Sequence, residues 1–126
     1  MNNDVNQVAT SALAYLGDCV IELKVRNYLV SEKGLSSSAS LNREALNFVR
    51  ASAQSEAMNY IEPLLDEDEM TAYRRGRNIG HTNVPKSASV SEYRRATGME
   101  ALFGYLHLQG KDARIDELFR IGYQLN

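Results

Sequence analysis

The sequence has 126 residues, 44% hydrophobic and 24% charged, with a formal net charge of −2, a balance typical of a single globular domain over 1–126. A lone cysteine, Cys19, excludes an intrachain disulfide and, with only two histidines, disfavours a structural zinc site. No apolar run approaches the ~20 residues of a membrane span, and the N-terminus lacks signal-peptide features, so we expect a cytoplasmic protein without a membrane partner.

Apolar residues recur at three- and four-residue spacing through most of the chain, which predicts an all-α domain of about six or seven helices. A first helix, capped by Asn3 or Asp4, is expected to end near Leu16, and a second to continue through Leu29. Residues 31–40 include a serine run and are expected to form a loop. A long third helix is expected over 41–62.

The second half of the chain is predicted to hold three more helices. Four acidic residues at 66–69 open a short helix that ends in the basic segment 73–77, an order that suits the helix dipole. Residues 78–89 read as a loop, and 90–108 as a long helix. Gly110 is expected to stop that helix, and Asp112 to cap a last helix over 113–123.

Charge is distributed unevenly along the sequence. Residues 73–95 contain six arginines or lysines and one acid, whereas the rest of the chain contains eight basic and fifteen acidic residues. A basic segment on an acidic body predicts a local anion-binding surface. The alternative is a solvated basic face that balances the acids at 66–69.

Two carboxylates, Asp18 and Glu100, each lie in the middle of an apolar stretch of predicted helix. A buried, unpaired carboxylate is costly, so each needs a base, a raised pKa or a metal ion. One interpretation is two separate ion pairs, with Arg26 and Arg94 as partners; the other is a shared metal site. For Glu22 we favour a helical (i, i+4) pair with Arg26.

Two segments carry a family resemblance. Residues 14–23, AYLGDCVIEL, resemble the signature helix of the ribonuclease III catalytic domain, and 100–106, EALFGYL, are similar to its second carboxylate segment. Residues 74–78, RRGRN, and 93–95, YRR, point to Mini-ribonuclease III, the branch without a separate double-stranded-RNA-binding domain. The resemblance covers about 13–110 and implies a homodimeric, all-helical endonuclease.

The resemblance implies an activity and a site. Asp18 and Glu100 would be the catalytic, metal-binding carboxylates, with Mg²⁺ as cofactor and Mn²⁺ as a substitute. The reaction would hydrolyse double-stranded RNA, leaving a 5′-phosphate and a 3′-hydroxyl, and the family's usual substrate is precursor 23S ribosomal RNA. Typical ribonuclease III enzymes have two further acids, where this sequence has Ala14 and Thr97. Thr97 could hold a metal-bound water through its hydroxyl.

The resemblance and the charge pattern together give the expected contact surfaces. Tyr15 occupies the place of an aromatic that the family uses at its dimer interface, although a core tyrosine is the simpler alternative. Arginine suits phosphate because its planar fork can donate two hydrogen bonds at once. The predicted RNA-binding residues are Arg74, Arg75, Arg77, Asn78, His81, Lys86, Arg94 and Arg95.

Two other function classes remain open from the sequence. The loss of two acids makes a non-catalytic structured-RNA-binding module on the same fold a reasonable alternative. A helical protein-interaction domain is a third hypothesis, which salt-dependent RNA binding would exclude.

Overall fold

The computed structural model describes residues 4–79 and 88–126, and every regular element within them is helical. The α-helices are α1 (Thr10–Asn27), α2 (Ser38–Val49), α3 (Ala51–Ile61), α4 (Glu67–Arg77), α5 (Val90–Leu108) and α6 (Asp112–Gly122). Short 3₁₀ segments cover Val5–Gln7 and Glu62–Leu64, and a π-helical turn, Tyr28–Glu32, continues α1. No helix in the described part of the chain is long and apolar enough to cross a membrane. The predicted all-α class is confirmed.

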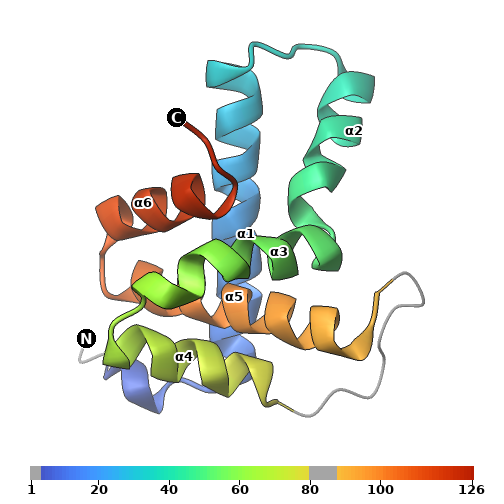
Figure 1. Cartoon of the computed structure of the whole chain (residues 1–126). Helices are drawn as coiled ribbons and strands as arrows, with labels where there is room; N and C mark the ends of the chain where they lie inside the picture. Colours follow the sequence, from blue (N-terminus) through green and yellow to red (C-terminus); the bar gives the residue numbers. More distant parts are fainter. Residues whose placement is uncertain (1–3, 80–87) are drawn as a thin grey trace.

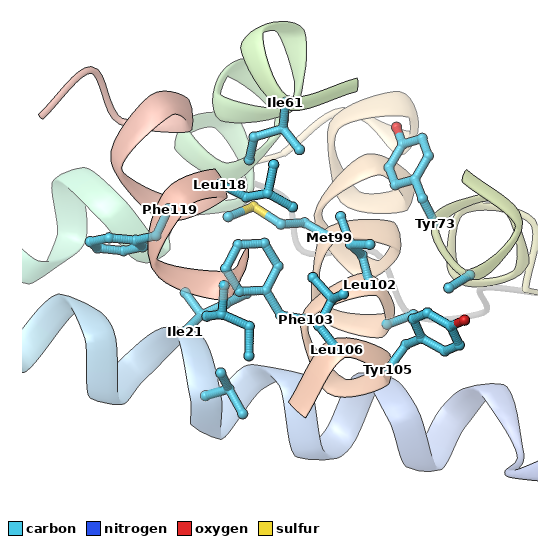
Figure 2. Packing of buried hydrophobic residues seen from close by; sticks show 14 of the residues in the cluster. Ile21, Ile61, Tyr73, Met99, Leu102, Phe103, Tyr105, Leu106, Leu118 and Phe119 are labelled. Carbon is cyan, nitrogen blue, oxygen red and sulfur yellow. The ribbon is translucent and has the colours of Figure 1, made fainter. Parts of the chain in front are cut away.

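Helix α5 is the central element of the fold. It packs against α1, α3, α4 and α6, and it crosses α1 in Figure 1. Figure 2 shows Met99, Leu102 and Phe103 of α5 pointing into a cluster that also contains Ile21 of α1 and Leu118 of α6. These five side chains are fully buried. A helix that is apolar over most of its circumference is expected in such a central position.

Helices α4 and α5 each begin with a reciprocal capping interaction. Asp66 accepts a hydrogen bond from the Glu69 N–H at 2.8 Å, and the Glu69 side chain accepts one from the Asp66 N–H. Ser89 and Glu92 make the same reciprocal pair at the start of α5. Each pair satisfies N–H groups that a helix leaves without partners. The predicted helix over 90–108 is confirmed with these bounds, and the predicted short acidic-to-basic helix is α4.

Two expected caps were wrong, because Asp4 caps the 3₁₀ segment before α1, and Asp112 is the first residue of α6. Three of the expected boundaries were also wrong. The two predicted N-terminal helices are one continuous α1, and the predicted loop over 31–40 already enters α2 at Ser38. The predicted helix over 41–62 is divided at Arg50, whose backbone is extended (φ −63°, ψ 147°). The break leaves carbonyls at the end of α2 without helical partners, and Tyr123 donates its hydroxyl to the Phe48 carbonyl at 2.6 Å. A tertiary contact, not local propensity, supports this break.

Candidate active site

The helices α1 and α5 touch through their backbones at two glycines. A Cβ added to Gly17 would lie 2.8 Å from the Gly104 nitrogen and 2.6 Å from the Glu100 carbonyl carbon. A Cβ added to Gly104 would lie 2.9 Å from the Leu13 carbonyl carbon. Such distances are too short for any side chain, so both positions require glycine. This close approach holds the neighbouring residues of the two helices together.

The crossing brings Asp18 and Glu100 into contact. Asp18 is exposed on α1, and Glu100 is half-buried on α5. Burial raises the pKa of Glu100 to about 8, and the charge and hydrogen bond of Asp18 act in the same direction. Near neutral pH the pair therefore holds a proton on Glu100.

The alternative of two separate ion pairs does not hold. Arg26 binds Glu22 instead, at 3.0 Å, as the helical (i, i+4) interpretation predicted. Within 4–79 and 88–126, neither Asp18 nor Glu100 pairs with an arginine or lysine. The expectation that Asp18 is buried was wrong, because Asp18 is exposed to solvent.

The carboxylate pair opens into a cavity of about 280 Å³ between α1 and α5. Its lining residues are Ser11, Ala14, Tyr15, Asp18, Ile79, Tyr93, Thr97 and Glu100. Thr97 donates its hydroxyl proton to the Tyr93 carbonyl at 3.0 Å, so only its oxygen lone pairs remain for the cavity. Thr97 can therefore accept a hydrogen bond from a water molecule held by the two carboxylates.

Sequence reasoning missed Ser11, Ile79 and Tyr93 as parts of this cavity. Two of them could have been found from spacing, since Ser11 lies two turns before Asp18, and Tyr93 two turns before Glu100, on the same helix faces. Ile79 follows the end of α4 and reaches the cavity only through the packing of α4 on α5.

The residues present fit a hydrated magnesium ion. No group of three or more histidine, cysteine or acidic side chains that could hold a metal occurs among the described residues, so the site offers two protein carboxylates. Mg²⁺ prefers hard oxygen ligands and commonly keeps several waters, which two carboxylates and an open cavity allow. A divalent cation would also remove the repulsion that favours a proton on Glu100.

Replacing Glu100 with glutamine should stabilise the metal-free fold. Because the pKa of Glu100 rises from 4.5 to about 8 on folding, its favourable contribution is complete below pH 4.5 and is lost as the pH rises to 8. Glutamine keeps the shape without that loss. We expect Glu100→Gln to raise the free energy of unfolding by about 3 kcal/mol at pH 7, measured by urea denaturation with a chelator present. The advantage should vanish at pH 4; an equal gain at both pH values would contradict the burial and repulsion inferred here.

The predicted RNA-binding arginines of α4 differ in their surroundings. Arg75 is held internally: it donates to the Val8 carbonyl at 2.9 Å and to the Thr10 hydroxyl at 3.1 Å. Arg74 is exposed, and the Arg77 guanidinium lies 5.7 Å from the centre of the Tyr73 ring. Arg75 therefore fixes the end of α4 to the start of α1, whereas Arg74 lies open to solvent.

The same division holds on α5. Arg95 donates to the Asn59 side chain at 2.9 Å and to the Ser55 hydroxyl at 3.2 Å, which ties α5 to α3, while Arg94 is exposed. The Arg77 Nε donates to the side chain of the predicted binding residue Asn78 at 3.2 Å. The predicted residues His81 and Lys86 lie outside the described part of the chain.

Tyr15 is not a core residue. It is 85% exposed, and with Leu23, 64% exposed, it borders a shallow hollow along α1 that includes Leu16 and Cys19. The alternative of a core tyrosine was wrong. Tyr15 lines both this hollow and the cavity of the carboxylate pair, so a surface for a partner would adjoin the site.

An all-helical domain with paired carboxylates at a helix crossing is the arrangement that the resemblance to helical, metal-dependent nucleases implied. The ribonuclease III domain model matches residues 11–111. The chain belongs to the ribonuclease III family, in its Mini-ribonuclease III branch, and is an endoribonuclease.

Relatives cover most of the chain. Mini-ribonuclease 3 of Clostridium tetani is 36% identical over 118 residues, spanning 94% of this chain and 78% of that protein. Mini-ribonuclease 3 of Symbiobacterium thermophilum is 44% identical over 108 residues, spanning 86% and 82%. A crystal structure of a Fusobacterium nucleatum protein superposes with a TM-score of 0.85 and 31% identity, covering 95% of each chain. The predicted fold and family are confirmed.

Proposed function

We propose that this chain is a Mg²⁺-dependent endoribonuclease that cleaves double-stranded RNA and leaves 5′-phosphate and 3′-hydroxyl ends. The observation that carries the proposal is the meeting of Asp18 and Glu100 at the glycine crossing, inside an open cavity. Mn²⁺ has the same preference for oxygen ligands and would substitute for Mg²⁺. A non-catalytic RNA-binding module has no need to keep both acids together, so we favour the enzyme.

Each residue of the site would have a separate role in phosphodiester hydrolysis. When bound, the metal ion supplies an activated water and stabilises negative charge on the phosphate. Asp18 and Glu100 would hold it, with Glu100 giving up its proton on loading. Thr97 would orient a water by accepting a hydrogen bond. Arg74, Arg77 and Arg94 would bind backbone phosphates, which suits A-form RNA because its base edges are hidden in a deep, narrow groove.

A direct assay tests this proposal. Purified protein is incubated with a labelled RNA duplex, or with either strand alone, in Mg²⁺, in Mn²⁺ or in chelator. We expect cleavage of the duplex in either metal and none in chelator, and we expect the products to carry 5′-phosphates. Cleavage that persists in chelator, or that prefers the single strands, would refute the proposal.

We further propose a homodimer formed through the exposed apolar residues of α1, so that two sites face one duplex and each cuts one strand. Tyr15 and Leu23 are large apolar side chains that a two-fold contact would bury. Wild-type protein should elute with about twice the 14.1 kDa mass of one chain by light scattering. The double variant Tyr15→Glu/Leu23→Glu should be monomeric. Tyr60→Glu, on exposed Tyr60 of α3, is the control and should remain dimeric; a dimeric double variant would place the interface elsewhere.

The biological substrate that we propose is precursor 23S ribosomal RNA, matured in the cytoplasm. Support comes from the membership in the Mini-ribonuclease III branch. Cells depleted of the protein should accumulate 23S precursors with unprocessed ends. Complementation by wild type but not by Asp18→Asn would support this role, whereas normal 23S ends in depleted cells would exclude it.

A further inference from the structure

A second cavity, of about 460 Å³, lies beside the candidate active site at the end of α4. We call it the arginine pocket; its charged residues are Arg77, Arg94, Arg95 and Glu62. The two cavities are adjacent, because Asn78 lines the arginine pocket and the next residue, Ile79, lines the active-site cavity. On α5, Arg94 lines the arginine pocket, and its neighbour Tyr93 lines the active-site cavity. An RNA strand lying over the carboxylate pair would therefore also pass over this pocket.

The arginine pocket is positively charged and partly preorganised. It combines three arginines with one glutamate, and Glu62 lies 3.8 Å from Arg95. The Arg95 guanidinium is already fixed by Ser55 and Asn59, and Arg77 is held against the Tyr73 ring. Fixed guanidinium groups lose little side-chain entropy when an anion binds.

Arg94 is the member of the pocket with its donors open. Arg94 is exposed, and it makes no ion pair or hydrogen bond with the described residues. A guanidinium group can bind a phosphate through two parallel hydrogen bonds. Arg94 and Arg77 are therefore suited to bind one phosphate from two sides.

We propose that the arginine pocket binds a single backbone phosphate of the RNA substrate, different from the phosphate that is cut. This inference rests on the proposed function of the neighbouring site. The pocket would fix where the strand lies relative to Asp18 and Glu100, and so would help to choose the bond that is hydrolysed. The basic residues then have two different roles. Arg77 and Arg94 contact RNA, whereas Arg75 and Arg95 mainly position helices.

The test measures how RNA affinity depends on salt, because each neutralised phosphate contributes about 0.9 to the slope of log affinity against log salt. All proteins carry Asp18→Asn, so a short labelled duplex is bound but not cut. We expect Arg77→Gln/Arg94→Gln to weaken binding and lower the slope by about one per protomer. Arg43→Gln is the matched control: Arg43 is exposed on α2, which packs on α1 and α3, and its slope should equal the parent's. If the double variant does not fold, Arg94→Gln alone replaces it.

Two other outcomes of the salt titration would overturn the inference. An unchanged slope would mean that the pocket binds no phosphate, and a loss of about two per protomer would mean two separate phosphates. Single uncharged methylphosphonates, placed in turn along the duplex, locate the phosphate: one uncut position should weaken binding of the parent but not of the double variant. If the only such position is the scissile phosphate, the proposal is wrong. Failure of the wild type to cleave RNA would refute the proposed enzyme function but would leave these binding results interpretable.

Discussion

Replacing Asp18 with asparagine is expected to slow duplex cleavage about a thousandfold at saturating RNA, which corresponds to about 4 kcal/mol of lost transition-state stabilisation. In the part of the chain that the structure describes, the site has two protein carboxylates, so the loss of one charge halves the anionic ligands available to Mg²⁺. Asparagine keeps the size and hydrogen-bonding capacity of the side chain, and RNA affinity should remain within about threefold of the wild type. Single-turnover cleavage and duplex binding in chelator separate the two effects.

Glu22→Gln is the matched control for Asp18→Asn. Glu22 lies one helical turn from Asp18 and pairs with Arg26, an exposed interaction of small energy. Its replacement should change the cleavage rate by less than about threefold. If Asp18→Asn cut RNA at the wild-type rate, or if Glu22→Gln were equally inactive, the assignment of the site to Asp18 and Glu100 would be wrong.

Replacing Gly17 with alanine is expected to destabilise the protein by about 3 kcal/mol or more, measured by urea denaturation. The new methyl group would press on the backbone of Glu100 and Gly104, which cannot rotate away. Local propensity predicts the opposite sign, because alanine in a helix is favoured over glycine by about 1 kcal/mol. Any folded Gly17→Ala protein should also cut RNA slowly, since wider helix spacing separates the two carboxylates.

Gly110→Ala serves as the comparison for this second prediction. Gly110 has a positive φ of 71°, and no atom would contact an added Cβ within 4 Å. The cost there should be limited to the left-handed backbone, about 1 kcal/mol. A gain in stability for Gly17→Ala, or equal losses for the two variants, would show that α1 and α5 are not in backbone contact at this crossing.

Two residues stand where the family resemblance implies further acids. Ala14 and Thr97 both line the cavity of the carboxylate pair. The small Ala14 side chain leaves space where a carboxylate would otherwise reach, and Thr97 offers only an acceptor oxygen. Their place in the cavity supports a metal site with few protein ligands and many waters, as the sequence led us to expect.

The sequence alone determined the helical class, the bounds of α5, the reversal of charge along α4 and the chemical types available for catalysis. These features depend on periodicity and on capping residues, which act over a few neighbouring residues.

Tertiary structure decided which acids meet, which arginines remain exposed and where the chain breaks at Arg50. Asp18 and Glu100 are distant in sequence, and only the glycine contact between α1 and α5 brings them together. Arg75 and Arg94 have similar sequence surroundings, but hydrogen bonds to Val8 and Thr10 hold Arg75 half-buried, whereas Arg94 is exposed. Such contacts depend on how several helices fill space together, and no local pattern encodes that.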